Sequence, residues 1–477
     1  MEVCWIKCNF ANDWEVVHFS ITKWYTFGLP YTATIYYHDI GDYLSREQKL
    51  KMVHDFRSVK GMEWTEIVPN EKQDWINMRD GVFETMLSLA GARQALFRDN
   101  GPAISSGRDS WVYNYNREEL NSIIVVFLDN YNSLVEKHYE KNLFDETQIS
   151  WTANLKKYYE KNFRIEKDGY VFKALYRPFC LQWLYLNDKL LERPGITIKY
   201  RKERCPNIFM LVSKGGTKEM SAMLTSECSD YHSIGDTHVF PLYYYEKNVH
   251  RQKSLFDDTS DDDYIRHDGI TDWILKEVRS RYNGAKNITK EMIFYYVYGL
   301  LHSKDYRERF AADLKKSLPR IPIVERIEDF MAFYKAGKQL AELHLNYEEV
   351  SPHPEVVVHI TAKRADQDDY DYFRVDPKMK FRSKDDKSVI LYNANIRLEN
   401  IPLKAYDYIV NGKSAIEWIV ERYCVSIDKK SLIKNDANDW AREHGKPRYI
   451  LDLLLSVINV STQTVDIVNN LPHLTFD

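Results

Sequence analysis

At 477 residues the chain is too long for a single hydrophobic core, so its length predicts two to four domains. The formal net charge of −4 excludes a protein that is drawn to nucleic acid by its overall charge. Six cysteines without a Cys-x-x-Cys pair exclude a disulfide scaffold, and neither an apolar run of about 18 residues nor a secretory signal is present. We therefore expect a soluble cytoplasmic protein with no membrane partner.

The first regular elements begin after residue 31. Residues 1–31 show no sustained period of a helix or a strand and stay unassigned. Ile35 and Tyr37 alternate as in a strand, and Ser45 then stands where a helix N-cap is expected. The sequence predicts a strand followed by a helix.

The next part of the chain mixes a long helix with strands and loops. Apolar residues at helical spacing predict a helix over about 117–141. The stretch 170–245 is predicted to consist of strands and loops, and the alternation of Ile196, Ile198 and Tyr200 predicts one of its strands. An α/β lobe fits this pattern.

An acidic run, SLFDDTSDDDY, lies within residues 251–268 and predicts a solvated linker that would repel a phosphate backbone. Helical spacing follows from about residue 270 to 347, with Thr289 as an N-cap. The apolar stripe FYYVYGLLH in this section is predicted to be helix core before it is a recognition helix.

The last part of the chain again mixes strand and helix patterns. Alternating apolar residues from Ile390 to Leu398 predict a single strand. Helices are predicted near Ser414–Tyr423 and Arg448–Ser456.

Two sets of catalytic strings are missing. No G-x-x-x-x-G-K-[ST] loop is present, so the chain encodes no ATP-driven motor. An amino-methyltransferase needs a glycine-rich turn for S-adenosylmethionine and an Asn-Pro-Pro-Tyr loop for the flipped base, and neither occurs. We expect no cofactor in this chain.

A polar cluster in SDYHSIGDTHVFPL allows an alternative function. His232, Asp236 and His238 alternate in a way that could hold zinc or iron, which would suit a metal-dependent hydrolase. The other interpretation is that these are ordinary hydrogen-bonded side chains at a strand edge.

An ordered series of strings carries a family resemblance over nearly the whole chain from about residue 32. They are TATIYYHDIGDYLSREQKL, EWTEIVPNEKQDWINMRD, SSGRDSWVYNYN, ISWTANLKK, KALYRPF, GDTHVFPLYYYE, DGITDWIL, ITKEMIFYYVYGLLHSKDYRERFAADLKKSLPRIP, NGKSAIEWIVERY and NDANDWAREHGKPRYILDLL. The series resembles the C-terminal portion of type ISP restriction-modification enzymes, in which nuclease, helicase, adenine methyltransferase and target-recognition domains follow one another. Type IIG restriction enzymes share the longest string in looser form.

The resemblance implies a mixed α/β fold that starts with the end of a methyltransferase-like sheet. It divides the chain as follows: an unmatched segment 1–31, the end of a methyltransferase domain 32–97, an α/β target-recognition lobe 98–250, an acidic linker 251–268, a helical section 269–350 and a C-terminal α/β section 351–477.

The function that the resemblance implies is recognition of a short asymmetric double-stranded DNA site, without cutting or methylation by this chain. Motor and methyltransferase domains would be supplied on a separate chain, and S-adenosylmethionine, ATP and Mg²⁺ would belong to those domains. Because residues 1–31 depart from the expected methyltransferase strands, an inactive remnant of a longer gene is a further alternative.

Nine residues are candidates for DNA contact: Arg108, Trp111, Asn114, Lys156, Lys157, Arg177, Lys199, Arg201 and Lys202. In SSGRDSWVYN, Arg108 could reach a phosphate or a guanine edge and Asn114 an adenine, with Trp111 packed behind. Alternatively, Arg108 and Asp109 brace a loop and Trp111 is core.

The remaining candidates also have two interpretations. Arg177 either points outward or forms an internal salt bridge. The lysine and arginine clusters contact DNA or are simply solvated faces.

Overall fold

The computed structural model describes residues 3–7, 35–39, 44–76, 78–91, 94–137, 145–200, 205–213, 215–216, 218–248 and 264–476. The chain divides into two units, Met1–Gly81 and Val82–Asp477, and each is described by itself. The predicted contact residues Arg201 and Lys202 lie outside the described residues, as do residues 254–263 of the acidic run.

The first unit contains a three-stranded sheet of order β1-β2-β3, formed by Val3–Lys7, Ile35–Asp39 and Thr65–Ile67. Helix α1, Arg46–Asp55, follows β2, and a short 3-10 turn, Val59–Gly61, precedes β3. The Ser45 hydroxyl accepts a hydrogen bond from the Gln48 N–H at 3.2 Å, and the Ser45 N–H donates to Gln48 Oε1 at 2.7 Å. This reciprocal capping box fixes the start of α1, so the predicted strand and helix are confirmed.

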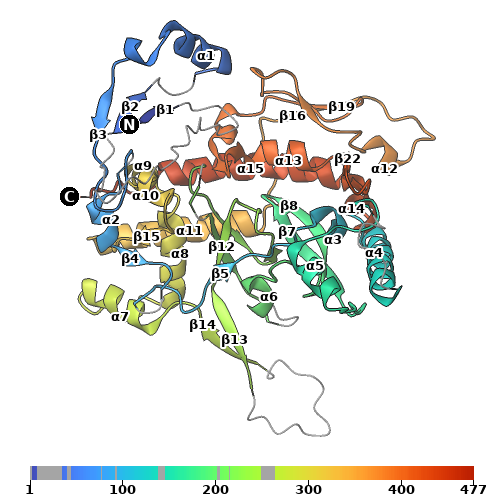
Figure 1. The fold of residues 1–477 in the computed structure, drawn as a ribbon, viewed down its shortest axis with the longest axis horizontal. Helices are drawn as coiled ribbons and strands as arrows, with labels where there is room; N and C mark the ends of the chain where they lie inside the picture. The colour runs from blue at the N-terminus through green and yellow to red at the C-terminus, as the bar shows by residue number, and fades with distance from the viewer. Residues whose placement is uncertain are drawn as a thin grey trace, which may run out of the picture. The chain divides into compact units, whose positions relative to one another are not determined.

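Helix α2, Gly81–Thr85, starts at the last residue of the first unit and continues into the second unit, which contains several sheets (Figure 1). One antiparallel sheet has the order β10-β9-β12-β5, from Ala222–Thr225, Phe209–Ser213, Thr237–Pro241 and Gly101–Pro102. Another has the order β11-β7-β8-β6, from Cys228–Ser229, Tyr170–Arg177, Cys180–Leu186 and Tyr113–Asn114.

Three helices, α3 (Asp109–Val112), α4 (Arg117–Lys137) and α5 (Ala153–Glu160), accompany the second sheet. The predicted long helix is confirmed as α4, which buries Leu120, Phe127 and Tyr131 in one cluster with Leu184 of β8. An amphipathic helix of this length gains most of its stability from such burial.

The predicted strand at 196–200 is wrong. Ile196–Tyr200 form one helical turn, α6, in which Thr197 and Tyr200 are buried on the same face. Three alternating apolar residues are too short a pattern to separate a strand from a single helical turn.

The helical section consists of α7 to α11: Asp272–Arg281, Lys290–Leu300, Lys304–Arg309, Ala311–Leu314 and Ile327–Leu345. The Thr289 hydroxyl accepts from the Met292 N–H at 3.2 Å, which confirms the predicted N-cap. Every residue from Ile293 to Leu300 is buried, so the apolar stripe is helix core as predicted.

Two short sheets flank the helical section. Strands β13 and β14, Tyr243–Lys247 and Tyr264–Asp268, form a hairpin that extends away from the helices in Figure 1. The predicted linker 251–268 overlaps β14 at its end, because residues 264–268 pair with β13. Strands β4 and β15, Leu87–Ser88 and Arg320–Ile321, form the other sheet.

The C-terminal section contains a sheet of order β16-β19-β18-β17, from Val357–Ile360, Ile396–Glu399, Ile390–Leu391 and Lys380–Phe381. The single strand predicted over 390–398 is wrong, because Ile390 lies opposite Leu398 in a hairpin. The Asn393 side chain makes the turn by accepting from the N–H groups of Asn395 and Ile396 at 2.8 and 2.9 Å.

The remaining elements are α12 (Asp369–Tyr372), a 3-10 helix (Leu403–Asp407), β20 and β21 (Ile409–Val410, Lys413–Ser414), α13 (Ala415–Arg422), β22 and β23 (Val425–Ile427, Lys434–Asp436), α14 (Ala437–Glu443) and α15 (Tyr449–Asn469). Both predicted C-terminal helices are present, and α15 continues well beyond residue 456. Among the described residues α15 alone is long and apolar enough to span a membrane, and 72% of its apolar window is buried inside the protein.

Three of the predicted sections contribute to one hydrophobic cluster. The largest hydrophobic cluster contains Phe179, Tyr347 and Tyr423, which belong to the predicted lobe, helical section and C-terminal section respectively. The division of the chain falls after Gly81, because Phe83 and Phe97 are already buried in the second unit. The mixed α/β fold class is confirmed.

Candidate nucleic-acid interface

Arg108 precedes α3 and is buried, with only 4% of its surface exposed. Its Nη2 donates to Thr152 Oγ1 at 2.5 Å, and its guanidinium lies 5.1 Å from the centre of the Phe127 ring. Trp111 is also buried and contacts Phe127 edge to face. The geometry favours the interpretation in which Arg108 braces a loop and Trp111 is core.

Asn114 holds two distant segments together. Its Nδ2 donates to the Lys434 carbonyl at 3.2 Å, and the neighbouring Tyr115 N–H donates to Asn435 Oδ1 at 2.9 Å. Asn114 is 1% exposed, so its amide does not face solvent. These hydrogen bonds hold the β22–β23 hairpin against β6.

Arg177 forms an internal salt bridge, which was one of the two roles that the sequence allowed for it. Its Nη1 donates to Asp230 Oδ1 at 2.8 Å, and its Nη2 lies 3.3 Å from Asp109 Oδ2. Burial is the main cause that raises the pKa of Asp230, to about 7, and the like charge of Asp109 adds to it, while Arg177 opposes both effects. This network fixes α3 to the ends of β7 and β11.

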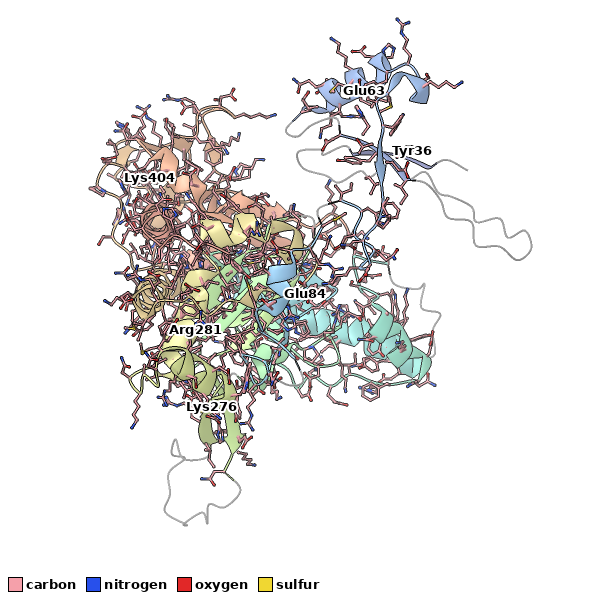
Figure 2. All side chains as sticks on the ribbon, turned by 90° about the vertical axis from the view of Figure 1, so that its left-hand side faces the viewer. Tyr36, Glu63, Glu84, Lys276, Arg281 and Lys404 are labelled. Atoms are coloured by element: carbon pink, nitrogen blue, oxygen red, sulfur yellow. The ribbon has the colours of Figure 1, made fainter. Side chains whose placement is uncertain are left out.

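Three of the predicted cations are exposed. Lys156 and Lys157 are neighbours on α5, and Lys199 lies near the end of α6 with 62% of its side chain exposed. The Lys199 ammonium forms an ion pair with Asp99 at 2.6 Å. Further exposed cations, Lys276 and Arg281, lie on α7 (Figure 2).

A polar cavity of about 540 Å³ brings together Arg108, Trp111 and Lys156. The loop after β22 completes its lining with Lys430 and Ser431. Sequence reasoning missed these two residues, since the only local signal is the short run Lys429–Ser431, which has no motif. The hydrogen bonds of Asn114 and Tyr115 explain how that loop reaches the cavity.

The predicted metal cluster does not assemble. His238 Nε2 lies 2.7 Å from Asn100 Oδ1, while the His232 N–H donates to Asp230. In the described part of the chain no group of three or more His, Cys, Asp or Glu residues is placed to hold a metal ion. The hydrolase alternative therefore has no support.

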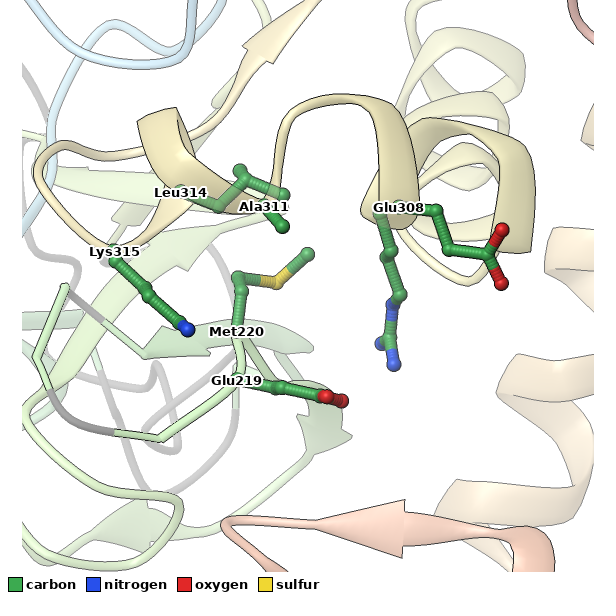
Figure 3. A pocket seen from close by; sticks show the side chains of 7 residues that line it. Glu219, Met220, Glu308, Ala311, Leu314 and Lys315 are labelled. Carbon is green, nitrogen blue, oxygen red and sulfur yellow. The ribbon is translucent and has the colours of Figure 1, made fainter. Parts of the chain in front are cut away.

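A smaller cavity of about 300 Å³ lies beside α9 and α10 (Figure 3). Glu219 and Glu308 line it together with Arg307 and Lys315. The Arg307 Nε donates to the Leu301 carbonyl at 2.7 Å. Its two carboxylates balance its two cations, which leaves no net positive charge to attract a phosphate, so we do not assign this cavity to DNA contact.

Comparison with known proteins gives one family and several solved structures. The model of the Type ISP C-terminal specificity domain matches residues 95–453. A nuclease-deletion mutant of the Type ISP restriction-modification enzyme LlaGI, solved with a DNA substrate mimic, is 34% identical with a TM-score of 0.78, over 92% of this chain and 39% of that chain. The ATP-dependent Type ISP enzyme LlaBIII, solved bound to DNA, is 33% identical with a TM-score of 0.79, over 93% of this chain and 28% of that one.

The DrdV–DNA complex is 23% identical with a TM-score of 0.75, over 93% of this chain and 44% of that chain, and shows a shared fold. No curated protein matches the chain. The chain thus spans well under half the length of each of these three solved relatives.

The fold and the matched region define a specificity region of a restriction-modification enzyme. The family match covers most of the chain, from a point before β5 to the beginning of α15. The chain belongs to the Type ISP C-terminal specificity domain family.

Proposed function

We propose that this chain recognises a short asymmetric sequence in double-stranded DNA and supplies the target specificity of a restriction-modification system. One observation carries the proposal: a relative that is 34% identical over 92% of this chain was solved in complex with a DNA substrate mimic. Chains that share both sequence and fold over such a length are expected to share a binding surface, although fold alone would not imply it.

Local charge has to provide the affinity for the DNA backbone, because the net charge of the chain is −4. Lys156, Lys157 and Lys199 are exposed and can approach phosphates, and we propose them as backbone contacts together with Arg201 and Lys202. Such contacts position a protein on the duplex without reading its sequence.

The buried candidates take a supporting role in this proposal. Arg108, Trp111, Asn114 and Arg177 make internal contacts that hold α3, β6 and the β22–β23 hairpin in place. A rigid scaffold is what allows neighbouring loops to present side chains to base edges.

Catalysis belongs to other domains in this account. The chain covers 39% of the LlaGI chain and 28% of the LlaBIII chain, so motor and methyltransferase functions would reside in the remaining parts or on a separate polypeptide. ATP, Mg²⁺ and S-adenosylmethionine would be bound there. This chain on its own is proposed to neither cut nor methylate DNA.

Selection from a pool of randomised duplexes tests the proposal without knowledge of the target. The immobilised full chain should enrich one asymmetric sequence over successive rounds. Enrichment that reaches no consensus, in parallel selections at low and physiological salt, would contradict sequence recognition. Including the low-salt arm matters because backbone contacts weaken steeply as salt rises.

A further inference from the structure

The polar cavity beside Arg108 has the features of a ligand-binding site, and its lining residues belong to no catalytic motif described above. It has a volume of about 540 Å³ and is lined from three distant segments: α3, the start of α5 and the loop after β22. Trp111 and Trp151 contribute aromatic walls, and Lys156, Lys430 and Ser431 contribute polar atoms. The volume lies within the range of ordinary ligand sites.

Arg108 lacks partners for most of its donors. Its Nε and Nη1 are buried and make no hydrogen bond in the described part of the chain, while Nη2 is bonded to Thr152. Glu192 acts on Arg108 electrostatically, but its carboxylate accepts from the Asn154 N–H and forms no ion pair with Arg108 among the described residues. A buried cation that is not directly paired is costly, so such a site favours an anion nearby.

The carboxylates at the cavity are already occupied. Glu146 lies 3.2 Å from the Lys430 ammonium. Asp428 Oδ1 accepts from the Ser431 N–H and hydroxyl, both at 2.8 Å, and from the Lys430 N–H at 3.1 Å. The described lining therefore holds three cations, Arg108, Lys156 and Lys430, against two carboxylates, which leaves a net charge of +1.

We propose that this cavity binds a phosphate group. The Lys156 ammonium would form an ion pair with it, and the buried guanidinium of Arg108 would supply a positive field from below. The phosphate is either a free ion or part of a DNA backbone. A phosphate of the DNA backbone rests on the proposed function, whereas the binding of a free phosphate ion does not depend on DNA.

Two neighbouring lysines on α5 give a matched test. Lys156 and Lys157 are both exposed, but only Lys156 lines the cavity. Inorganic phosphate is titrated calorimetrically into the full chain and into Lys156→Gln and Lys157→Gln, at constant ionic strength. For a free-ion site we expect saturable one-to-one binding that weakens about tenfold in Lys156→Gln, as one charge-assisted hydrogen bond is lost, and is unchanged in Lys157→Gln.

A second arm uses duplex DNA in place of phosphate. If the backbone is the source, inorganic phosphate competes with the DNA for the wild-type chain. Lys156→Gln should weaken this competition about tenfold, whereas Lys157→Gln, which removes a proposed backbone contact outside the cavity, should leave it unchanged. The proposal is overturned if inorganic phosphate shows no saturable binding at millimolar concentration and does not compete with the DNA for the wild-type chain. If wild-type chain binds no DNA at all, the proposed function fails, and the phosphate titration alone decides this proposal.

Discussion

Gly299 of α8 and Gly337 of α11 lie face to face where the two helices cross. A Cβ atom added to Gly337 would lie 1.9 Å from the Tyr295 carbonyl oxygen and 2.8 Å from the Gly299 nitrogen. A Cβ on Gly299 would lie 2.3 Å from the Phe333 carbonyl oxygen. Because these atoms are backbone, neither helix can yield locally, and the crossing requires glycine on both sides.

Gly337→Ala should therefore destabilise the second unit. We expect the free energy of unfolding to fall by at least about 1–3 kcal/mol, the usual cost of overpacking a core. Urea denaturation followed by circular dichroism measures it. Gly81→Ala is the control, since no atom lies within 4 Å of an added Cβ there; an equal loss in both variants would contradict the close crossing.

The pair of Arg177 and Asp230 predicts a second stability effect. Arg177→Met removes the ion-pair partner of a carboxylate that is 1% exposed, and should lower the free energy of unfolding by about 3–5 kcal/mol. Lys167→Met breaks the exposed pair with Asp129, at 2.7 Å, and should cost less than about 1 kcal/mol. If the two substitutions lowered the free energy of unfolding by similar amounts, Arg177 would not be buried in this network.

His344 predicts a dependence of stability on pH. Its Nδ1 lies 2.5 Å from the Tyr298 hydroxyl, its Nε2 lies 2.9 Å from the Thr464 hydroxyl, and burial lowers its pKa to about 3. Since this histidine is neutral in the folded chain and titrates near its ordinary value when unfolded, its contribution is complete above about pH 6.5 and is lost as the pH falls toward 3.

Below about pH 6.5 the free energy of unfolding should therefore decline by about 1.4 kcal/mol per pH unit for each such histidine. Burial also lowers the pKa of the neighbouring His302, so wild-type chain should show the effect of both. His344→Gln keeps a polar group in place but takes up no proton on unfolding. Its free energy of unfolding should therefore decline less steeply with falling pH than that of the wild-type chain. Equal slopes for both proteins, from denaturation at several pH values, would contradict the neutral buried histidine.

Lys199 predicts a change in the salt dependence of DNA binding. Each lost phosphate contact reduces the slope of log affinity against log salt concentration by about 0.9. Lys199→Gln should show that reduction in a fluorescence anisotropy titration, whereas the exposed Lys276→Gln on α7 should not. Identical slopes for the two variants would remove Lys199 from the interface.

Local signals in the sequence were enough for much of the fold. Ser45 and Thr289 could be predicted as N-caps because a cap needs only its own hydroxyl and an N–H three residues later. The prediction of a single strand over 390–398 failed for a physical reason. Asn393 makes the turn with its side chain, whereas a glycine or proline would have been a clearer sign of a turn in the sequence.

The candidate site could be predicted only in part. Arg108 and Lys156 stood out by residue type, but whether a side chain is buried depends on tertiary packing that no local pattern contains. Ser431 lies within hydrogen-bond distance of Ser110 although 321 positions separate them in the sequence. Nothing near either residue indicates this contact.

The ratio of two affinities tests the central claim most directly. The full chain is titrated at one physiological salt concentration with the duplex enriched by selection and with a duplex of the same composition in scrambled order. Sequence recognition predicts that the enriched duplex binds at least about 10³-fold more tightly, the lower end of the range for specific DNA-binding proteins. A ratio near one would show that the chain binds the DNA backbone without reading its sequence, and would contradict the account.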